Sequence, residues 1–232
     1  MGADGHDRRG PVLAADNLIY ATIPSIVRRG SPGSSFQLLA AYCALGSGIG
    51  GFLYSVAFVL IARPSPKLGA GLSWVLLMIG GFLSAVVMVA LYERLREVDR
   101  NLALLGLLLA TVGALGSVIH GGYEVANLTH PPSSAPPDLP SQIDPRGLVT
   151  FGFAGLGLLG FASLMRRSPI FPAGLGTLGL VTGAAMIVVY LGRLIIFSPT
   201  NAVVLLAAGL TGFLLAPVWY IWLGLTLRRS LH

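Results

Sequence analysis

Residues 119–146, IHGGYEVANLTHPPSSAPPDLPSQIDPR, form the longest polar interruption in an otherwise apolar chain. The stretch begins with histidine, tyrosine and glutamate and ends in a proline-rich run, which cannot continue a helix. Three long apolar segments precede it and three follow it. It therefore divides the chain into two halves and predicts one long loop between them.

The composition argues against a water-soluble protein. Of 232 residues, 54% are hydrophobic and 10% are charged, whereas soluble domains are about 25% charged. The 31 glycines favour a compact bundle, because small residues let helices approach closely in lipid. The net charge of +6 comes from bases beside apolar segments and not from a basic face with interleaved aromatics, which argues against nucleic acid as a partner. The single cysteine, Cys43, permits no internal disulfide and no metal-ligand spacing.

Six charge-poor segments are long enough to cross about 30 Å of hydrocarbon, which takes about 20 helical residues. The fourth is the shortest, and the fifth contains Arg193 near its far end. Their continuous hydrophobicity predicts helices and not the alternating strands of a membrane barrel. We therefore predict an all-α, polytopic membrane helix bundle with six transmembrane helices. These helices span residues 36–62, 68–92, 101–123, 147–165, 169–197 and 201–227.

The predicted spans leave two tails and one long loop. Residues 1–35 form either a short interfacial helix or a disordered tail, residues 124–146 form the loop, and residues 228–232 form the second tail. Eleven of the fifteen lysines and arginines lie on the side of the amino terminus. By the positive-inside rule both termini are cytoplasmic, so the chain is a multi-pass protein of the cell membrane with its loop outside. The four bases on the other side are Arg63, Lys67, Arg146 and Arg193.

Two segments of the chain resemble each other. Residues 63–66 (RPSP) lead into residues 70–72 (AGL), and residues 166–169 (RRSP) lead into residues 173–175 (AGL) at the same spacing. Because three spans separate these units, they would belong to two inverted three-helix repeats, as in many transporters. The open alternative is chance similarity between common membrane residues.

Residues 91–105 (LYERLREVDRNLALL) are similar to the second cytoplasmic loop of a family of uncharacterised six-span bacterial membrane proteins. Residues 50–54 (GGFLY), 168–176 (SPIFPAGLG) and 222–223 (WL) resemble the same family, and the likeness covers about residues 36–227. The resemblance implies a six-span architecture in the bacterial inner membrane and no settled activity. That family has an acidic residue ahead of the tryptophan of its last span, where this chain has APV at 216–218.

Polar groups near the outer ends of two spans are the candidate functional residues. His120 and Glu124 are spaced i, i+4, so they share one face of the third span, and Tyr123 lies beside them. Tyr190 and Arg193 approach the outer end of the fifth span. An ionisable group inside a membrane is a functional candidate because burying it alone is costly. The alternative is a structural role, in which such groups join helices or extend to water.

His120 could also ligate haem, chlorophyll or a metal, since imidazole is a common protein donor. A haem in a helix bundle normally takes two histidines, but His6, His130 and His232 lie in the tails or the loop. We therefore predict neither a metal site nor a bound cofactor. No nucleophile elbow, zinc-protease helix, Walker loop or dinucleotide fingerprint occurs in a supporting context, so we expect no enzyme.

The favoured function is a non-enzymatic scaffold or accessory subunit that packs in the lipid bilayer against other membrane proteins or a second copy of itself. The alternative is a small transporter or channel, in which two halves move around a polar site near His120, Glu124 and Arg193. Glycines on several spans are the expected helix-packing positions. These are Gly46, Gly50, Gly152, Gly155, Gly179 and Gly183.

The topology predicts that Glu124 pairs with Arg193 and joins the third and fifth spans near the outer surface. Removal of one partner would leave a poorly solvated charge, which costs more than the roughly 0.2–1 kcal/mol of an exposed ion pair. Arg193→Ala should therefore lower the unfolding temperature in detergent more than Arg228→Ala, a change at the solvated terminus. Equal thermal stability of the two variants would contradict the pairing.

Overall fold

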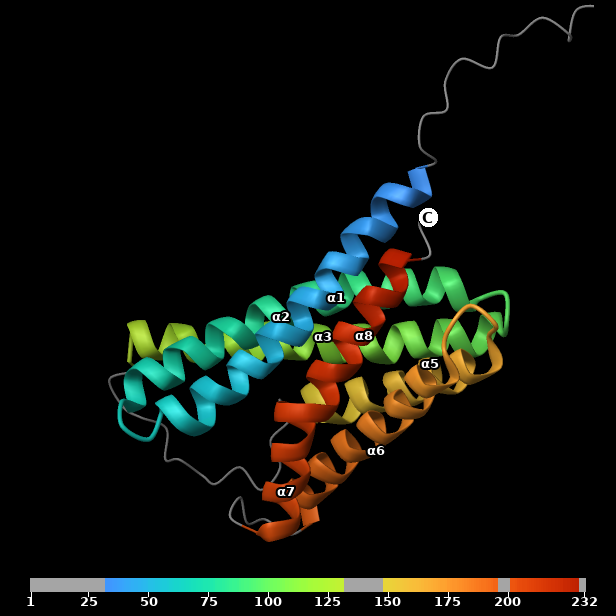
Figure 1. Cartoon of the computed structure of the whole chain (residues 1–232). Coiled ribbons are helices and arrows are strands. Elements are labelled where there is room, and N and C mark those ends of the chain that lie inside the picture. Colours follow the sequence, from blue (N-terminus) through green and yellow to red (C-terminus); the bar gives the residue numbers. More distant parts are fainter. Residues whose placement is uncertain (1–31, 132–147, 196–200, 230–232) are drawn as a thin grey trace, which may run out of the picture.

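The protein is a bundle of helices. The computed structural model describes residues 32–131, 148–195 and 201–229, without the side chains of residues 32–34, 148–149 and 193–195. Within these ranges every regular element is a helix, which confirms the predicted all-α bundle (Figure 1). The α-helices are α1 (Pro32–Val56), α2 (Pro66–Leu95), α3 (Arg100–Thr129), α5 (Ala154–Arg167), α6 (Ala173–Ile195), α7 (Ala202–Leu210) and α8 (Ala216–Arg229). The π-helical segments are η1 (Ala57–Ile61), η2 (Leu148–Phe153) and η3 (Thr211–Leu215).

Local sequence determines where several helices begin. The side chain of Asp99 precedes α3 and accepts a hydrogen bond from the Leu102 backbone N–H at 3.0 Å. Asn201 caps α7 in the same way through the Val203 N–H at 2.9 Å. Pro66 occupies the first turn of α2, where the N–H that proline lacks would have no helical partner. Each cap satisfies a donor that a helix start leaves unpaired.

Five helical stretches of the described chain are long and apolar enough to cross a membrane, which supports a multi-pass membrane protein. The predicted fourth span, 147–165, is not among them. In the described chain this region is a continuous helical run, η2 followed directly by α5, from Leu148 to Arg167. Helix α3 also continues past the predicted end at Tyr123 to Thr129, so the predicted loop starts with helix. The five stretches are Ser35–Ile61, Pro66–Leu95, Arg100–Thr129, Ala173–Gly192 and Ala202–Arg229.

Helices that pack against each other follow a closed order. The order is α8, α1, α2, α3, α5 and α6, and α6 returns to α7, η3 and α8. Figure 1 shows α2 running beside α3 and α5 beside α6. We call one end of the bundle the arginine-rich end and the opposite end the loop end. At the arginine-rich end α1, α3 and α6 begin and α2, α5 and α8 end. The arginine-rich end carries Arg94, Arg96, Arg100, Arg166, Arg167, Arg228 and Arg229.

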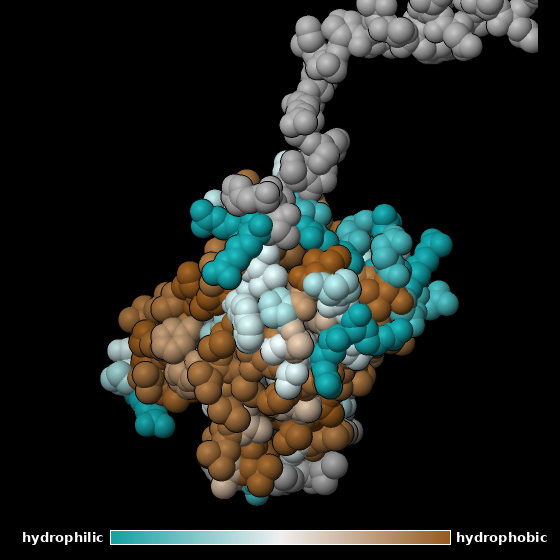
Figure 2. Space-filling view, turned by 45° about the vertical axis from the view of Figure 1, so that its right-hand side comes forward, coloured by the Kyte–Doolittle hydropathy of each residue, from teal (hydrophilic) through white to brown (hydrophobic). Residues whose placement is uncertain are grey.

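The apolar core lies toward the arginine-rich end. The loop half instead buries mainly small or polar residues, including Ser55, Ser73, Thr150 and Thr211. Figure 2 shows hydrophobic surface over much of one face and hydrophilic side chains gathered toward one end, as expected for contact with lipid. The largest fully buried side chains of the core are Val87, Leu91, Leu95, Phe161, Leu164, Met165, Leu175, Trp219, Leu223 and Leu227.

The two halves of the chain differ in the local geometry of their helices. In the first half a π segment follows α1, whereas in the second half one π segment precedes α5 and another lies between α7 and α8. The predicted inverted repeat therefore has no counterpart in the positions of the π segments. It stays a prediction.

Glycines let the backbones of α5 and α6 touch. A Cβ atom added at Gly183 would lie 2.9 Å from the carbonyl oxygen of Gly155, and one at Gly155 would lie 3.0 Å from that of Gly183. A Cβ at Gly179 would lie 2.8 Å from both the Ala162 Cβ and the Trp219 Nε1. No larger residue fits these three positions without a shift of the neighbouring helix.

The other three expected packing glycines differ from one another. A Cβ at Gly46 would meet only the side-chain end of Leu83, at 3.1 Å. Gly152 is buried in η2. Gly50 departs from the expectation, because a Cβ there would meet no described atom within 4 Å. It lies between exposed Ile49 and Leu53, so within this chain it brings no second helix close.

Valine at Gly183 should destabilise the bundle. Its side chain would enter the backbone of α5, and overpacking of this kind typically costs about 1–3 kcal/mol. Gly209→Val is the matched control, because a Cβ at Gly209 would meet no described atom within 4 Å. Thermal unfolding in one detergent should give a lower midpoint for Gly183→Val than for Gly209→Val. Equal midpoints would contradict the close contact between α5 and α6.

Candidate functional site

The polar face of α3 lies at the loop end of the bundle. Helix α3 stays regular through residues 120–124, so His120 and Glu124 are one turn apart on the same face. Both residues are half-buried, whereas Tyr123 is 53% exposed. His120 and Glu124 therefore belong to the inner side of α3, and Tyr123 belongs to its outer surface.

A chain of ring contacts joins three helices near His120. Tyr54 stacks on Phe58 with ring centroids 5.8 Å apart, and Phe58 meets Trp74 edge-on at 6.0 Å. The indole of Trp74 lies 5.1 Å from the imidazole of His120. Such pairs contribute about 0.5–1.5 kcal/mol beyond their buried area. The ring chain therefore holds α1, η1, α2 and α3 together at the loop end and orients the imidazole.

Helix α6 carries the other predicted candidates. Tyr190 is half-buried, and the side chain of Arg193 lies outside the described part of the chain. Helix α5 and η2 pack against both α3 and α6 and separate these two helices over most of their length. The structure groups His120 with rings of α1, η1 and α2. The pairing of Glu124 with Arg193 stays a prediction.

Among the described residues, several buried side chains have a polar atom that makes no hydrogen bond. These atoms include the hydroxyls of Ser47, Thr150 and Thr211 and the indole N–H of Trp219. Each residue is less than a tenth exposed. Thr150 lies in η2 and Thr211 in η3, and π segments frequently occur at functional sites. A buried polar group without a partner costs about 1–3 kcal/mol, so a polar ligand or water at these atoms would stabilise the protein.

Two further glycines, Gly51 and Gly80, lie on the inner faces of α1 and α2. Gly51 lies two turns after buried Ala44 on α1, and Gly80 lies two turns from both Ser73 and Val87, which are buried on α2. A Cβ added at either glycine would meet no described atom within 4 Å. The inner faces of both helices are therefore open at these positions.

The register of α1 and α2 places these two glycines at the same level along the bundle. Ala62 lies against Gly69, and the antiparallel register set by this contact puts Gly51 at the level of Gly80. We call the open volume beside them the glycine-lined space. Sequence reasoning missed it, because glycine in a membrane helix normally indicates close packing. The sequence signal that could have indicated it is helical spacing: both glycines lie two turns from residues that are buried on the same helix face.

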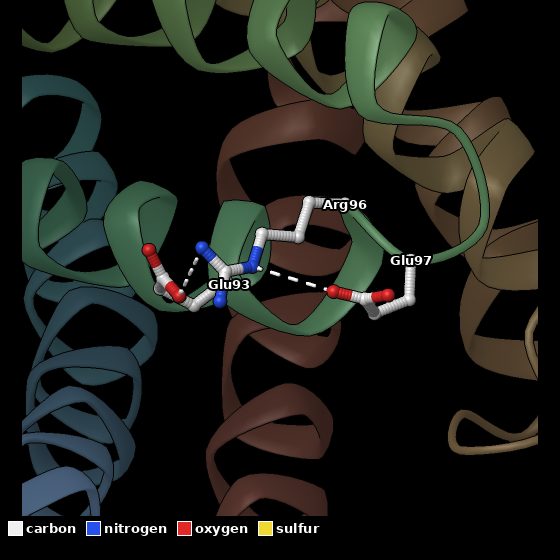
Figure 3. A network of polar contacts seen from close by, with 3 residues as sticks. All are labelled: Glu93, Arg96 and Glu97. Atoms are coloured by element: carbon white, nitrogen blue, oxygen red, sulfur yellow. Dashed lines mark ion pairs between the residues drawn. The ribbon is translucent and has the colours of Figure 1, made fainter. Parts of the chain in front are cut away.

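Charged residues between α2 and α3 form surface ion pairs at the arginine-rich end. Arg96 lies 3.3 Å from Glu93 and 3.7 Å from Glu97 (Figure 3). All three side chains are largely exposed, so each pair contributes at most about 1 kcal/mol. Arg94 instead turns inward and donates a hydrogen bond to the side-chain oxygen of Gln37 on α1. These contacts stabilise the helix ends and do not indicate a catalytic or binding site.

The described histidines do not fit a haem site with two histidine ligands. His120 and His130 lie ten residues apart along α3 and its cap, or about 15 Å at 1.5 Å per residue. His6 and His232 fall outside the described residues. Among the residues that the structure describes, no three His, Cys, Asp or Glu side chains gather where they could hold a metal ion.

No protein-family model, curated protein or solved structure matches this chain. The resemblance to uncharacterised six-span bacterial membrane proteins therefore stays a prediction. What the structure does show is a multi-pass helical membrane protein with a closed apolar core at one end and a glycine-lined space toward the other.

Proposed function

We propose that the protein is a small transporter or channel that passes a polar solute through the interior of its bundle. The observation that carries this proposal is the glycine-lined space between Gly51 and Gly80. Inside a bundle, a glycine normally admits a neighbouring backbone, as Gly155 and Gly183 do here. Glycines at one level on two neighbouring helices, without such a neighbour, leave room for a solute to approach the main chain.

Polar groups near the glycine-lined space support passage of a polar solute. Ser47 lies one turn from Gly51 on the same face of α1, and its hydroxyl makes no hydrogen bond with a described residue. His120 and Glu124 lie farther toward the loop end on the inner side of α3. Transporters bind their substrates near mid-depth, where helices depart from regular α geometry. Of the three described π segments, η3 lies inside a long helical stretch, between α7 and α8, whereas η1 and η2 lie at the loop end.

The apolar core supports an entrance at the loop end only. Fully buried Leu91, Leu164 and Leu223 close the bundle toward the arginine-rich end. By the positive-inside rule this end faces the cytoplasm and both termini lie there, so the conformation is open outward. The resemblance suggests the bacterial inner membrane as the location. Passage then requires α5, α6 and α8 to move relative to α1–α3, and the π segments η2 and η3 provide the bends.

Leucine at Gly51 should block transport, because its side chain would fill the glycine-lined space without displacing a described atom. Gly50→Leu is the matched control: Gly50 is the adjacent residue, has equally open surroundings and borders exposed Ile49. In proteoliposomes, solute flux should fall at least about tenfold in Gly51→Leu and stay near wild type in Gly50→Leu. The solutes to compare are glycerol, urea, potassium and chloride.

Three results would decide against transport. The first is that wild-type proteoliposomes pass none of the four solutes faster than empty liposomes do. The second is full flux in Gly51→Leu, and the third is an equal loss of flux in Gly50→Leu and Gly51→Leu. Equal melting temperatures of the two variants in detergent would show that any loss of flux comes from the filled space and not from unfolding.

The second candidate function is the scaffold or accessory subunit, and Gly50 is the observation that favours it. Gly46 and Gly50 have the spacing of small residues through which membrane helices associate, and no described atom lies within 4 Å of a Cβ at Gly50. If α1 associates laterally through this edge, Gly50→Leu should convert a detergent-stable oligomer into a monomer in analytical ultracentrifugation. A wild-type protein that is already monomeric would exclude self-association through Gly50.

A further inference from the structure

Ser47 differs from other serines in the helices of this protein. Five of them each donate a hydrogen bond to a backbone carbonyl three or four residues earlier, the usual way to satisfy a hydroxyl inside a membrane helix. The Ser47 side chain is 7% exposed, and its Oγ makes no hydrogen bond with a described residue. Its donor and its lone pairs therefore remain available to a ligand. The five serines with carbonyl partners are Ser55, Ser73, Ser84, Ser117 and Ser163.

Two further hydroxyls lie at the depth of Ser47. A Cβ added at Gly48 would lie 2.9 Å from the Pro217 carbonyl oxygen, and this contact between α1 and α8 places Ser47 near the level of Tyr220. The Tyr220 hydroxyl lies near that of Ser84 on α2, whose own hydrogen atom is donated to the Gly81 carbonyl oxygen at 2.9 Å. Helices α1, α2 and α8 thus each contribute one hydroxyl at the base of the glycine-lined space.

The groups at this depth are uncharged. The charged side chains of α2 and α8 lie near the helix ends, and the described part of α1 has none. His120 and Glu124 lie farther toward the loop end on α3. Cys43 and Tyr220, which lie near Ser47, carry a thiol and a phenol that are neutral at pH 7. An ion at this point would need carboxylates or a ring of carbonyl oxygens to replace its water. Hydroxyls suit a solute that both donates and accepts hydrogen bonds.

We propose that the transported solute is a small uncharged molecule with hydroxyl or amide groups, such as a polyol or urea, and that the Ser47 hydroxyl binds it at the base of the glycine-lined space. This inference rests on the proposed transport function and adds the class of substrate. Gly51 and Gly80 supply the room, Ser47 supplies a donor and an acceptor, and the hydroxyls of Tyr220 and Ser84 lie at the same depth.

The test measures the permeability of proteoliposomes to glycerol and urea by stopped-flow light scattering, with potassium and chloride flux measured on the same vesicles. The wild-type protein should pass glycerol or urea and neither ion. Ser47→Ala removes one hydroxyl with little change in volume, so the flux of the uncharged solute should fall about three- to tenfold, as expected for one neutral hydrogen bond.

Ser163→Ala is the matched control, because the Ser163 hydroxyl already donates to the Gly160 carbonyl at 2.7 Å and lies toward the arginine-rich end. Its flux should equal that of the wild type. Ion flux without flux of uncharged solutes would overturn the proposed substrate class and leave the transport function standing. Flux of no solute at all would overturn the transport function itself. Flux of uncharged solutes that Ser47→Ala leaves unchanged would remove Ser47 from the binding site.

Discussion

Close contact between helix backbones is the constraint on which the rest of this structure depends. In lipid an apolar side chain gains little by moving into the protein, so helices associate through packing and hydrogen bonds. Here glycines supply the packing. A Cβ at Gly81 on α2 would lie 2.6 Å from the Ala114 carbonyl oxygen of α3, and one at Gly224 on α8 would lie 2.8 Å from that of Ala41 on α1. Together with the pair Gly155 and Gly183, these contacts set the order of helices in the bundle.

The same bundle is built differently at its two ends. Toward the arginine-rich end, large side chains such as Phe161 and Trp219 fill the interior completely. Toward the loop end the buried residues are smaller and more polar, and Gly51 and Gly80 face open space. Stability is therefore concentrated at one end, where the packing is dense. Buried polar groups are concentrated toward the other.

The two halves of the chain also differ in how firmly the loop end is held. The ring contacts from Tyr54 through Phe58 and Trp74 to His120 tie α1, η1, α2 and α3 together. The π segments of the second half, η2 and η3, each have a buried threonine whose hydroxyl makes no hydrogen bond with a described residue.

The sequence by itself determined the helices, several of their ends and the shared face of His120 and Glu124, because run length, capping and i, i+4 spacing are local properties. It also indicated that the fourth span is the shortest, and this region is absent from the five described stretches that are long and apolar enough to cross a membrane. Local pattern could not distinguish Gly50 from Gly51, or Ser47 from the serines that donate to a carbonyl. That difference depends on which faces of α1 meet α2 and α8. Only the tertiary structure decided it, because the packing of helices far apart in the chain determines whether a backbone or open space lies opposite a given residue.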